Sequence, residues 1–114
     1  MQQHWAEALA RQHLEAKGYR LLTTNHREKA GEIDLVMRDG ESLVFVEVRQ
    51  RRSDLRGSAA ESIGAQKLRR LTAAAGLYML RNYGTTDLDC RFDAVLISGT
   101  EESCTVEHLQ HLTA

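Results

Sequence analysis

Apolar and polar positions recur with two different periods along this chain of 114 residues, and the period separates helices from strands. From His4 to Lys17, apolar side chains follow one broad helical face, and Gly18 comes where a C-terminal cap would end the helix. A second stripe predicts a helix from Ala65 to Asn82, with Gly64 as its cap. One helix is therefore expected at the start of the chain and one past its middle.

Strands are expected on both sides of the second helix. They run from Tyr19 to Asn25, Glu32 to Arg38, Leu43 to Arg49 and Cys90 to Ser98, with Thr105 to Leu109 as a further short edge strand. A polar loop is expected from Asn25 to Gly31, and residues 50–63 show no regular pattern. The order α-β-β-β-α-β predicts one α/β domain over residues 1–114, built as a mixed sheet flanked by helices.

The second and third strands form a predicted hairpin, because Asp39-Gly40 is a strong turn signal between them. If Arg38 pairs with Leu43, Asp34 lies directly opposite Glu47; a shorter loop would instead place Asp34 opposite Phe45. Alternation predicts one face with Ile33, Leu35 and Met37, and the other with Glu32, Asp34 and Val36.

Two opposed carboxylates indicate a cation site. Their Cβ atoms would be about 5 Å apart, and carboxylates that close repel unless a positive charge lies between them. Mg²⁺ or Mn²⁺ suits such oxygen ligands. Arg49 lies on the same face as Glu47 and could hold a phosphate. The alternative is an ordinary acid–arginine pair on a solvated sheet face, but the third strand is apolar on both faces, which makes idle charges there costly.

Basic residues are concentrated after the third strand. Between Arg49 and Arg70, seven basic and two acidic residues give +5, although the whole chain carries −1. We expect a nucleic-acid surface from Arg51, Arg52, Arg56, Lys67, Arg69 and Arg70, with Lys67 at a helix N-terminus that favours phosphate. The alternative is a solvated charged face. Glu7 borders the apolar stripe of the first helix, where it either reaches the rim of the site or is simply exposed.

Composition places the chain among cytoplasmic proteins. It has only two cysteines, Cys90 and Cys104, and these lack metal-ligand spacing. No apolar run resembles a signal peptide or reaches the length of a membrane span, so no membrane association is expected. His108 and His111 form no convincing zinc pattern.

Three segments carry a family resemblance. They are Gly31–Val36 (GEIDLV), Val44–Arg49 (VFVEVR) and Arg91–Asp93 (RFD), accompanied by Glu7, Asn25 and Lys67. Together they resemble the YraN family of uncharacterised proteins, which is similar to the Holliday-junction-resolvase branch of the PD-(D/E)xK nucleases.

The resemblance implies a restriction-endonuclease-like fold with a catalytic set of Asp34, Glu47, Arg49 and Glu7, in which Asp34 and Glu47 bind the metal. Arg49 departs from the motif's lysine, and arginine cannot act as a base. Two functions are therefore expected as alternatives. One is a Mg²⁺-dependent endonuclease acting on DNA, on branched or repair intermediates, for which a homodimer would present two sites. The other is an inactive nucleic-acid- or protein-binding module on a nuclease core.

Overall fold

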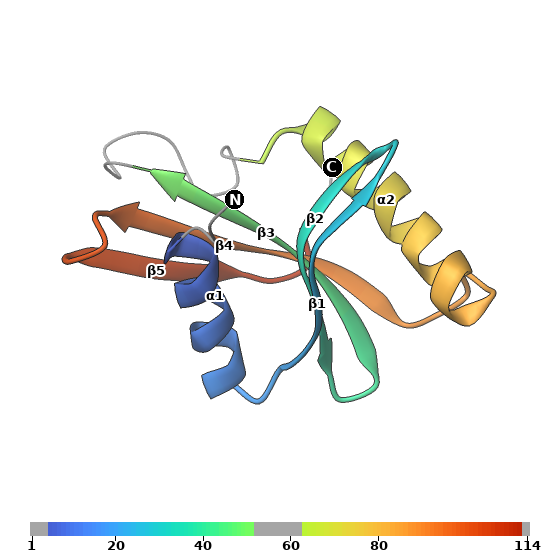
Figure 1. Ribbon diagram of the computed structural model, residues 1–114, viewed down its shortest axis with the longest axis horizontal. Helices are drawn as coiled ribbons and strands as arrows, with labels where there is room; N and C mark the ends of the chain where they lie inside the picture. The colour runs from blue at the N-terminus through green and yellow to red at the C-terminus, as the bar shows by residue number, and fades with distance from the viewer. Residues whose placement is uncertain (1–4, 52–62, 113–114) are drawn as a thin grey trace.

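In the part of the chain that the structure describes, five strands form one mixed sheet with a helix on each face (Figure 1). The computed structural model describes residues 5–51 and 63–112. Its elements are α1 (Trp5–Ala16), β1 (Arg20–Glu28), β2 (Gly31–Asp39), β3 (Ser42–Arg51), α2 (Ala65–Tyr83), β4 (Cys90–Gly99) and β5 (Cys104–Leu109). The predicted order of elements is confirmed, and so is the additional edge strand.

The strands lie in the order β1-β2-β3-β4-β5, so every strand neighbours those next to it in the sequence. Only β3 and β4 are parallel, and the other neighbouring pairs are antiparallel. Parallel neighbours need a long crossover, and α2 lies in that connection. The predicted α/β class, a mixed sheet flanked by helices, is confirmed.

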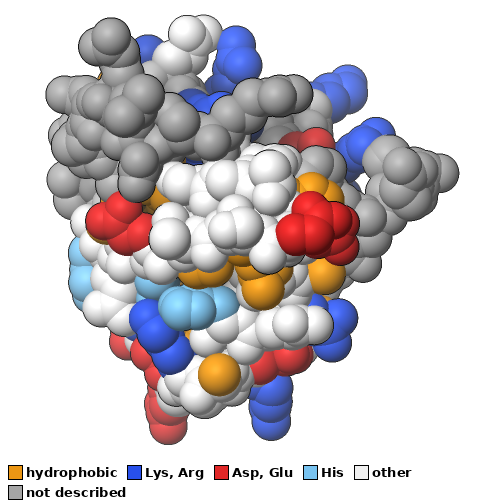
Figure 2. All heavy atoms as spheres, turned by 90° about the vertical axis from the view of Figure 1, so that its left-hand side faces the viewer, with side chains coloured by type: hydrophobic (Ala, Val, Ile, Leu, Met, Phe, Trp, Pro, Cys, Tyr) orange, Lys and Arg blue, Asp and Glu red, His pale blue; other side chains and the backbone are white. Residues whose placement is uncertain are grey.

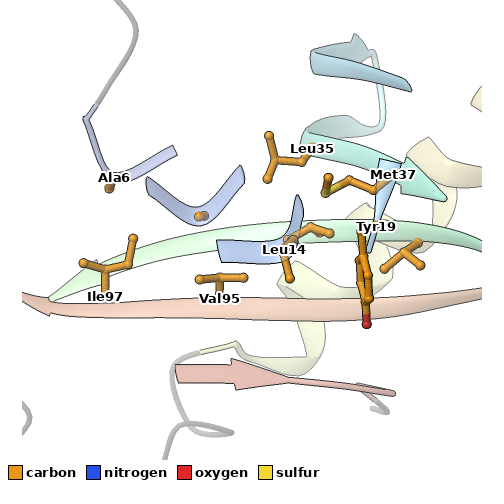
Figure 3. Packing of buried hydrophobic residues seen from close by; sticks show 10 residues of the cluster. Ala6, Leu14, Tyr19, Leu35, Met37, Val95 and Ile97 are labelled. Atoms are coloured by element: carbon orange, nitrogen blue, oxygen red, sulfur yellow. The ribbon is translucent and has the colours of Figure 1, made fainter. Parts of the chain in front are cut away.

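The α1 side of the sheet holds a closely packed apolar layer. Ala6, Ala10 and Leu14 lie one helical turn apart and are almost fully buried against the sheet. They pack with Tyr19 and with side chains from three strands, among them Leu35, Met37, Val95 and Ile97 (Figure 3).

The opposite face is covered by α2, whose buried side chains recur at helical spacing. Leu68, Leu71, Ala74, Ala75, Tyr78 and Met79 pack on this side with Ile33, Val36, Leu43 and Phe45. The helix ends at Gly84, which adopts a left-handed conformation with φ 77° and donates its N–H to the carbonyl of Leu80. Both faces of β3 are therefore buried, as its apolar sequence predicts.

The expected loop from Asn25 to Gly31 is wrong, because β1 continues to Glu28 and β2 already begins at Gly31. The polar side chains of this segment find partners on α2. Glu28 accepts two hydrogen bonds from Arg81, at 2.8 and 3.0 Å, and the His26 ring lies edge-on to Tyr78. These distant contacts stabilise the part of β1 beyond Asn25, which the local sequence does not predict.

The predicted shared face of Ile33, Leu35 and Met37 is also wrong. Leu35 and Met37 pack on the α1 side, whereas Ile33 belongs to the α2 side. The alternation breaks at Asp34, between them. Nearby, β1 has a register shift between Leu21 and Thr23, and Asn25 has a left-handed φ of 49°. The sheet is therefore irregular where the carboxylate of Asp34 lies.

The face of the molecule shown in Figure 2 carries interspersed charges. On the side shown in Figure 2, acidic and basic side chains are scattered, and apolar side chains appear only in small areas between uncharged groups. In the part of the chain that the structure describes, no helix combines the length and apolarity needed to cross a membrane.

Candidate active site

The site lies where β2 and β3 separate. Their pairing runs from Asp39↔Ser42 through Arg38↔Leu43 to Leu35↔Val46. The predicted Arg38–Leu43 pair is confirmed, and the same register continued by one position puts Asp34 opposite Glu47. Beyond Leu35 the two strands are connected by a side chain of β2 in place of its backbone: Oδ2 of Asp34 accepts the N–H of Val48 on β3 at 2.8 Å.

Glu47 is the buried carboxylate of the site, with a side chain only 6% exposed. One of its oxygens, Oε2, lies 3.3 Å from Nζ of Lys67, in the first turn of α2. The other oxygen, Oε1, is buried and has no hydrogen-bond partner within residues 5–51 and 63–112. A buried carboxylate oxygen without a partner is costly, so this oxygen is a ready ligand for a cation.

Asp34 has an unusual proton affinity. Burial raises its pKa to about 7 from an ordinary 3.8, and the negative charge of Glu47 is the next largest cause. The hydrogen bond from Val48 opposes the rise, while the charges of Glu7 and Glu32 add to it. Asp34 and Glu47 are therefore close enough to repel, as the sequence predicts, and a cation between them would relieve that repulsion.

Glu7 approaches this pair from α1. Its Oε1 accepts a hydrogen bond of 3.2 Å from Nδ2 of Asn25, and its charge contributes to the raised pKa of Asp34. Asn25 lies in β1 opposite Asp34 by register, between the pairs Thr24↔Leu35 and His26↔Ile33. The sequence pattern alone predicts no role for Asn25. Its left-handed φ, which asparagine tolerates better than most residues, is the feature that orients it here.

The predicted basic residues are only partly gathered at the site. Arg49 is half-buried on β3, two positions after Glu47, and Lys67 contacts Glu47 directly. Arg69 and Arg70 are exposed. On a helix, Arg70 lies near the side of Lys67, while Arg69 points well away from it. Arg52 and Arg56 lie outside the described residues, and of Arg51 only the backbone in β3 is described.

The carboxylates fit a hard divalent cation that shares its coordination with substrate. Within the described residues, no three His, Cys, Asp or Glu side chains converge to hold an ion by themselves. Mg²⁺ is commonly bound by one or two carboxylates, with waters and substrate phosphates as its remaining ligands. Asp34 and the unpartnered oxygen of Glu47 match that pattern, and they do not match a closed structural zinc site.

A second polar cluster explains the Arg91-Phe92-Asp93 segment. Asp93 is fully buried on β4 and accepts hydrogen bonds from Arg91 (3.2 Å), from Nε2 of His108 (2.8 Å) and from the N–H of His111 (3.2 Å). Burial alone would raise the pKa of Asp93, but these hydrogen bonds and the Arg91 charge outweigh it and hold that pKa below its ordinary value.

This cluster ties distant parts of the chain together. Arg91 also donates to Asp39 at 3.1 Å and to the hydroxyl of Tyr19, which accepts from Gln110 at 2.9 Å. The other ring nitrogen of His108, Nδ1, lies 2.9 Å from Nζ of Lys17. Both nitrogens of His108 are thus engaged with protein groups. The cluster joins the segment after α1 to β2, β4 and β5, and we assign it to stability.

The hollow next to α1 is a different place. It has a volume of about 390 Å³ and is lined by Trp5, Ala8, Leu9, Gln12 and Glu101. None of the predicted catalytic residues lines it. The chemistry is therefore expected at the separating strands and not in this hollow.

Comparison with known proteins matches most of the chain. Residues 6–97 match the family described as "Uncharacterised protein family UPF0102". Proteins named "UPF0102 protein YraN" from Salmonella newport and Salmonella typhimurium are each 51% identical to this chain over 96 residues. Each alignment covers 83% of this chain and 73% of the relative. The region matched to the family includes Glu7, Asp34, Glu47 and Lys67.

Proposed function

The chain belongs to the UPF0102 family, and from that premise we propose that it is a metal-dependent nuclease that hydrolyses phosphodiester bonds in DNA. The observation that carries the proposal is the close pair of carboxylates, of which Glu47 is buried and Asp34 half-buried. Asp34 has a pKa raised to about 7, and Glu47 has one oxygen lacking a partner among the described residues. Together they favour a positive charge in addition to that of Lys67. Ordinary structural carboxylates, such as Asp93, have their partners within the protein.

Each residue has a distinct part in the proposed reaction. Asp34 and Glu47 hold Mg²⁺ or Mn²⁺, which supplies Lewis-acid stabilisation of the phosphate and activates water when it is bound. Arg49 contributes a fixed positive charge that stabilises the phosphate as negative charge develops. Glu7, held by Asn25, adds a third acidic group at the rim of the site.

Branched or repair intermediates are the proposed DNA substrates. A four-way junction has two strands to cut, and a homodimer would present two copies of the site by symmetry. The proposed compartment is the cytoplasm, in keeping with the two free, half-buried thiols of Cys90 and Cys104.

A cleavage assay tests the proposal. Purified protein is incubated with linear, flapped and four-way DNA in Mg²⁺, Mn²⁺ or EDTA, beside an Asp34→Asn variant. We expect cleavage in the presence of either metal and none in EDTA. Asparagine has nearly the shape of aspartate but lacks its charge, so Asp34→Asn should abolish cleavage. Activity that survives this substitution would identify a contaminating nuclease.

One alternative function has support of its own. Arg49 stands where the resembling nucleases have lysine, and arginine remains protonated near neutral pH. A protein that has kept the nuclease core only to bind nucleic acid or another protein would show DNA binding without cleavage in the same assay. That result would favour the binding module over the nuclease.

A further inference from the structure

The ion pair between Lys67 and Glu47 joins two side chains with very different surroundings. The Glu47 side chain is 6% exposed, whereas that of Lys67 is 41% exposed. A buried carboxylate is stable only when its charge is compensated, and Lys67 supplies that charge at 3.3 Å. The carboxylate is fixed by the sheet, while the ammonium approaches from the solvent side on a flexible stem. If one partner moves, it is Lys67.

A divalent cation would compete with this ammonium. A cation held by Asp34 and by Oε1 of Glu47 brings two positive charges to the carboxylate that Lys67 now compensates through Oε2. Like charges a few ångströms apart repel strongly in a partly buried site. The exposed stem of Lys67 lets the ammonium turn outward, and Glu47 retains a compensating charge from the cation.

A displaced ammonium would remain in a place suited to phosphate. Lys67 is the third residue of α2, and the first turn of that helix contains no acidic residue. The N–H groups and the dipole at a helix N-terminus favour an anion. The same lysine can therefore serve Glu47 in the free protein and a nucleic-acid phosphate in the complex.

We propose that Lys67 links the two binding events: it compensates Glu47 until a divalent cation takes that carboxylate, and it is then released to bind a phosphate of the nucleic acid. This inference rests on the proposed function. It predicts positive coupling, in which the cation strengthens DNA binding and DNA strengthens cation binding by the same factor.

Binding measurements test this inference without relying on catalysis. Mn²⁺ affinity is measured by calorimetry on the DNA-free protein. The affinity for a cleavage-resistant phosphorothioate duplex is measured by fluorescence anisotropy, with and without Mn²⁺. In the parent, Mn²⁺ should tighten DNA binding by between about fivefold and a hundredfold. In Lys67→Met this gain should largely disappear. Mn²⁺ should bind DNA-free Lys67→Met several-fold more tightly than it binds the parent, because the competing ammonium is gone.

Two further variants separate this role from a structural one. Lys67→Arg keeps the charge and should retain the coupling, even if Lys67→Met is too unstable to measure. Arg70→Met removes an exposed charge one turn further along α2 and should weaken DNA binding by the same factor with and without Mn²⁺.

The outcomes distinguish the two proposals. Tighter Mn²⁺ binding together with lost coupling in Lys67→Met supports the role of Lys67. If the parent binds Mn²⁺ and DNA but Lys67→Met has unchanged or weaker Mn²⁺ affinity, or the parent's full coupling, the role of Lys67 is wrong and the nuclease proposal stands. If Lys67→Met cannot be measured, loss of coupling in Lys67→Arg overturns the inference in the same way. A parent that binds neither Mn²⁺ nor DNA overturns both.

Discussion

At the scale of single residues, Asp34 shows how a functional group can cost stability. It is held among other acidic side chains, and its hydrogen bond from Val48 only partly offsets their repulsion. A structural carboxylate in the same position would be better replaced by an uncharged residue. The persistence of a charge there is understandable if the charge is used by a cation that the free protein lacks.

Replacing Asp34 by Asn should therefore stabilise the metal-free protein at alkaline pH. The pKa of Asp34 is raised from 3.8 to about 7, so the folded protein binds this proton more tightly than the unfolded chain does. Stability is then lost as pH rises from about 4 to 7, and the full cost is present above 7. At pH 8 in EDTA, we expect Asp34→Asn to raise the free energy of unfolding by roughly 2–4 kcal/mol, since each unit of pKa shift corresponds to about 1.4 kcal/mol.

The measurement is urea unfolding of both proteins between pH 4 and 8, where the difference should shrink toward the acid end. Glu41→Gln, in the exposed hairpin loop, is the matched control and should change little at any pH. A variant less stable than the parent at pH 8 would show that Asp34 is a stabilising charge.

Arg49 decides between catalysis and binding. Because its guanidinium does not deprotonate near neutral pH, it acts only as a positive charge. Arg49→Lys keeps that charge and should keep or raise the cleavage rate. Arg49→Ala should lower turnover by about 10²–10³, as for other electrostatic stabilisers. The measurement is the cleavage rate at saturating Mg²⁺ or Mn²⁺, with thermal unfolding to check that each variant is folded. If Arg49→Ala cleaves DNA as fast as the parent, Arg49 has no part in the reaction.

At the scale of elements, the β1–β2 hairpin is positioned by a close contact with α2. A Cβ added at Gly31 would lie 3.1 Å from the backbone carbonyl oxygen of Arg70, tighter than ordinary packing allows. Because Gly31 has no Cβ, β2 can approach the N-terminal part of α2 closely at this point. Because Asp34 lies on β2 and Lys67 on α2, this contact also sets the position of the two sides of the site.

Gly31→Ala should push β2 and α2 apart. Since the obstructing atom is backbone, we expect a loss of about 1–3 kcal/mol in the free energy of unfolding, typical of overpacking. The measurement is chemical denaturation beside Gly76→Ala, whose added Cβ meets nothing within 4 Å and which lies inside α2, where alanine is favoured. Equal stability of the Gly31→Ala variant and the parent would show that the contact is relaxed in solution.

The hairpin of β2 and β3 illustrates what the sequence could predict. The turn signal places the hairpin, and Asp34 opposite Glu47 was one of two registers that the sequence allowed; the observed pairs agree with that register. The break in alternation at Asp34 could not be predicted. The continuation of β1 beyond Asn25 could not be predicted, because Glu28 is held by Arg81, 53 residues away. The pairing of Lys67 with Glu47 was missed for the same reason. The local pattern of apolar and polar positions can identify neighbouring side chains within one hairpin. Contacts between that hairpin and a distant helix, such as Lys67–Glu47, depend on the whole fold and cannot be predicted in this way.

At the scale of the whole molecule, a net charge of −1 means that binding to DNA must come from one face. By helical periodicity Arg70 lies near the side of α2 that carries Lys67, whereas Arg20 begins β1 at the end opposite the β1–β2 turn. Arg70→Ala should weaken DNA binding and flatten its dependence on the logarithm of salt concentration by about one unit of slope. Arg20 is also exposed, and Arg20→Ala changes the net charge by the same amount. Because Arg20 lies away from the proposed surface, this substitution should leave the slope unchanged. Equal effects of the two variants would mean that binding reflects total charge and not a defined surface.

The irregularity of β1 has a consequence beyond the site. β1 forms one edge of the described sheet, and a long regular edge strand can pair with another molecule and start aggregation. Its register shift at Leu21–Thr23 and the left-handed Asn25 divide that edge into short pieces. Asn25→Val would favour extended backbone and lengthen the regular edge. We expect the Asn25→Val variant to scatter more light than the parent at high concentration. Equal scattering by the two proteins would mean that the edge is protected by other means. Increased scattering would show that the distortion that orients Asn25 toward Glu7 also keeps the protein from polymerising through the β1 edge.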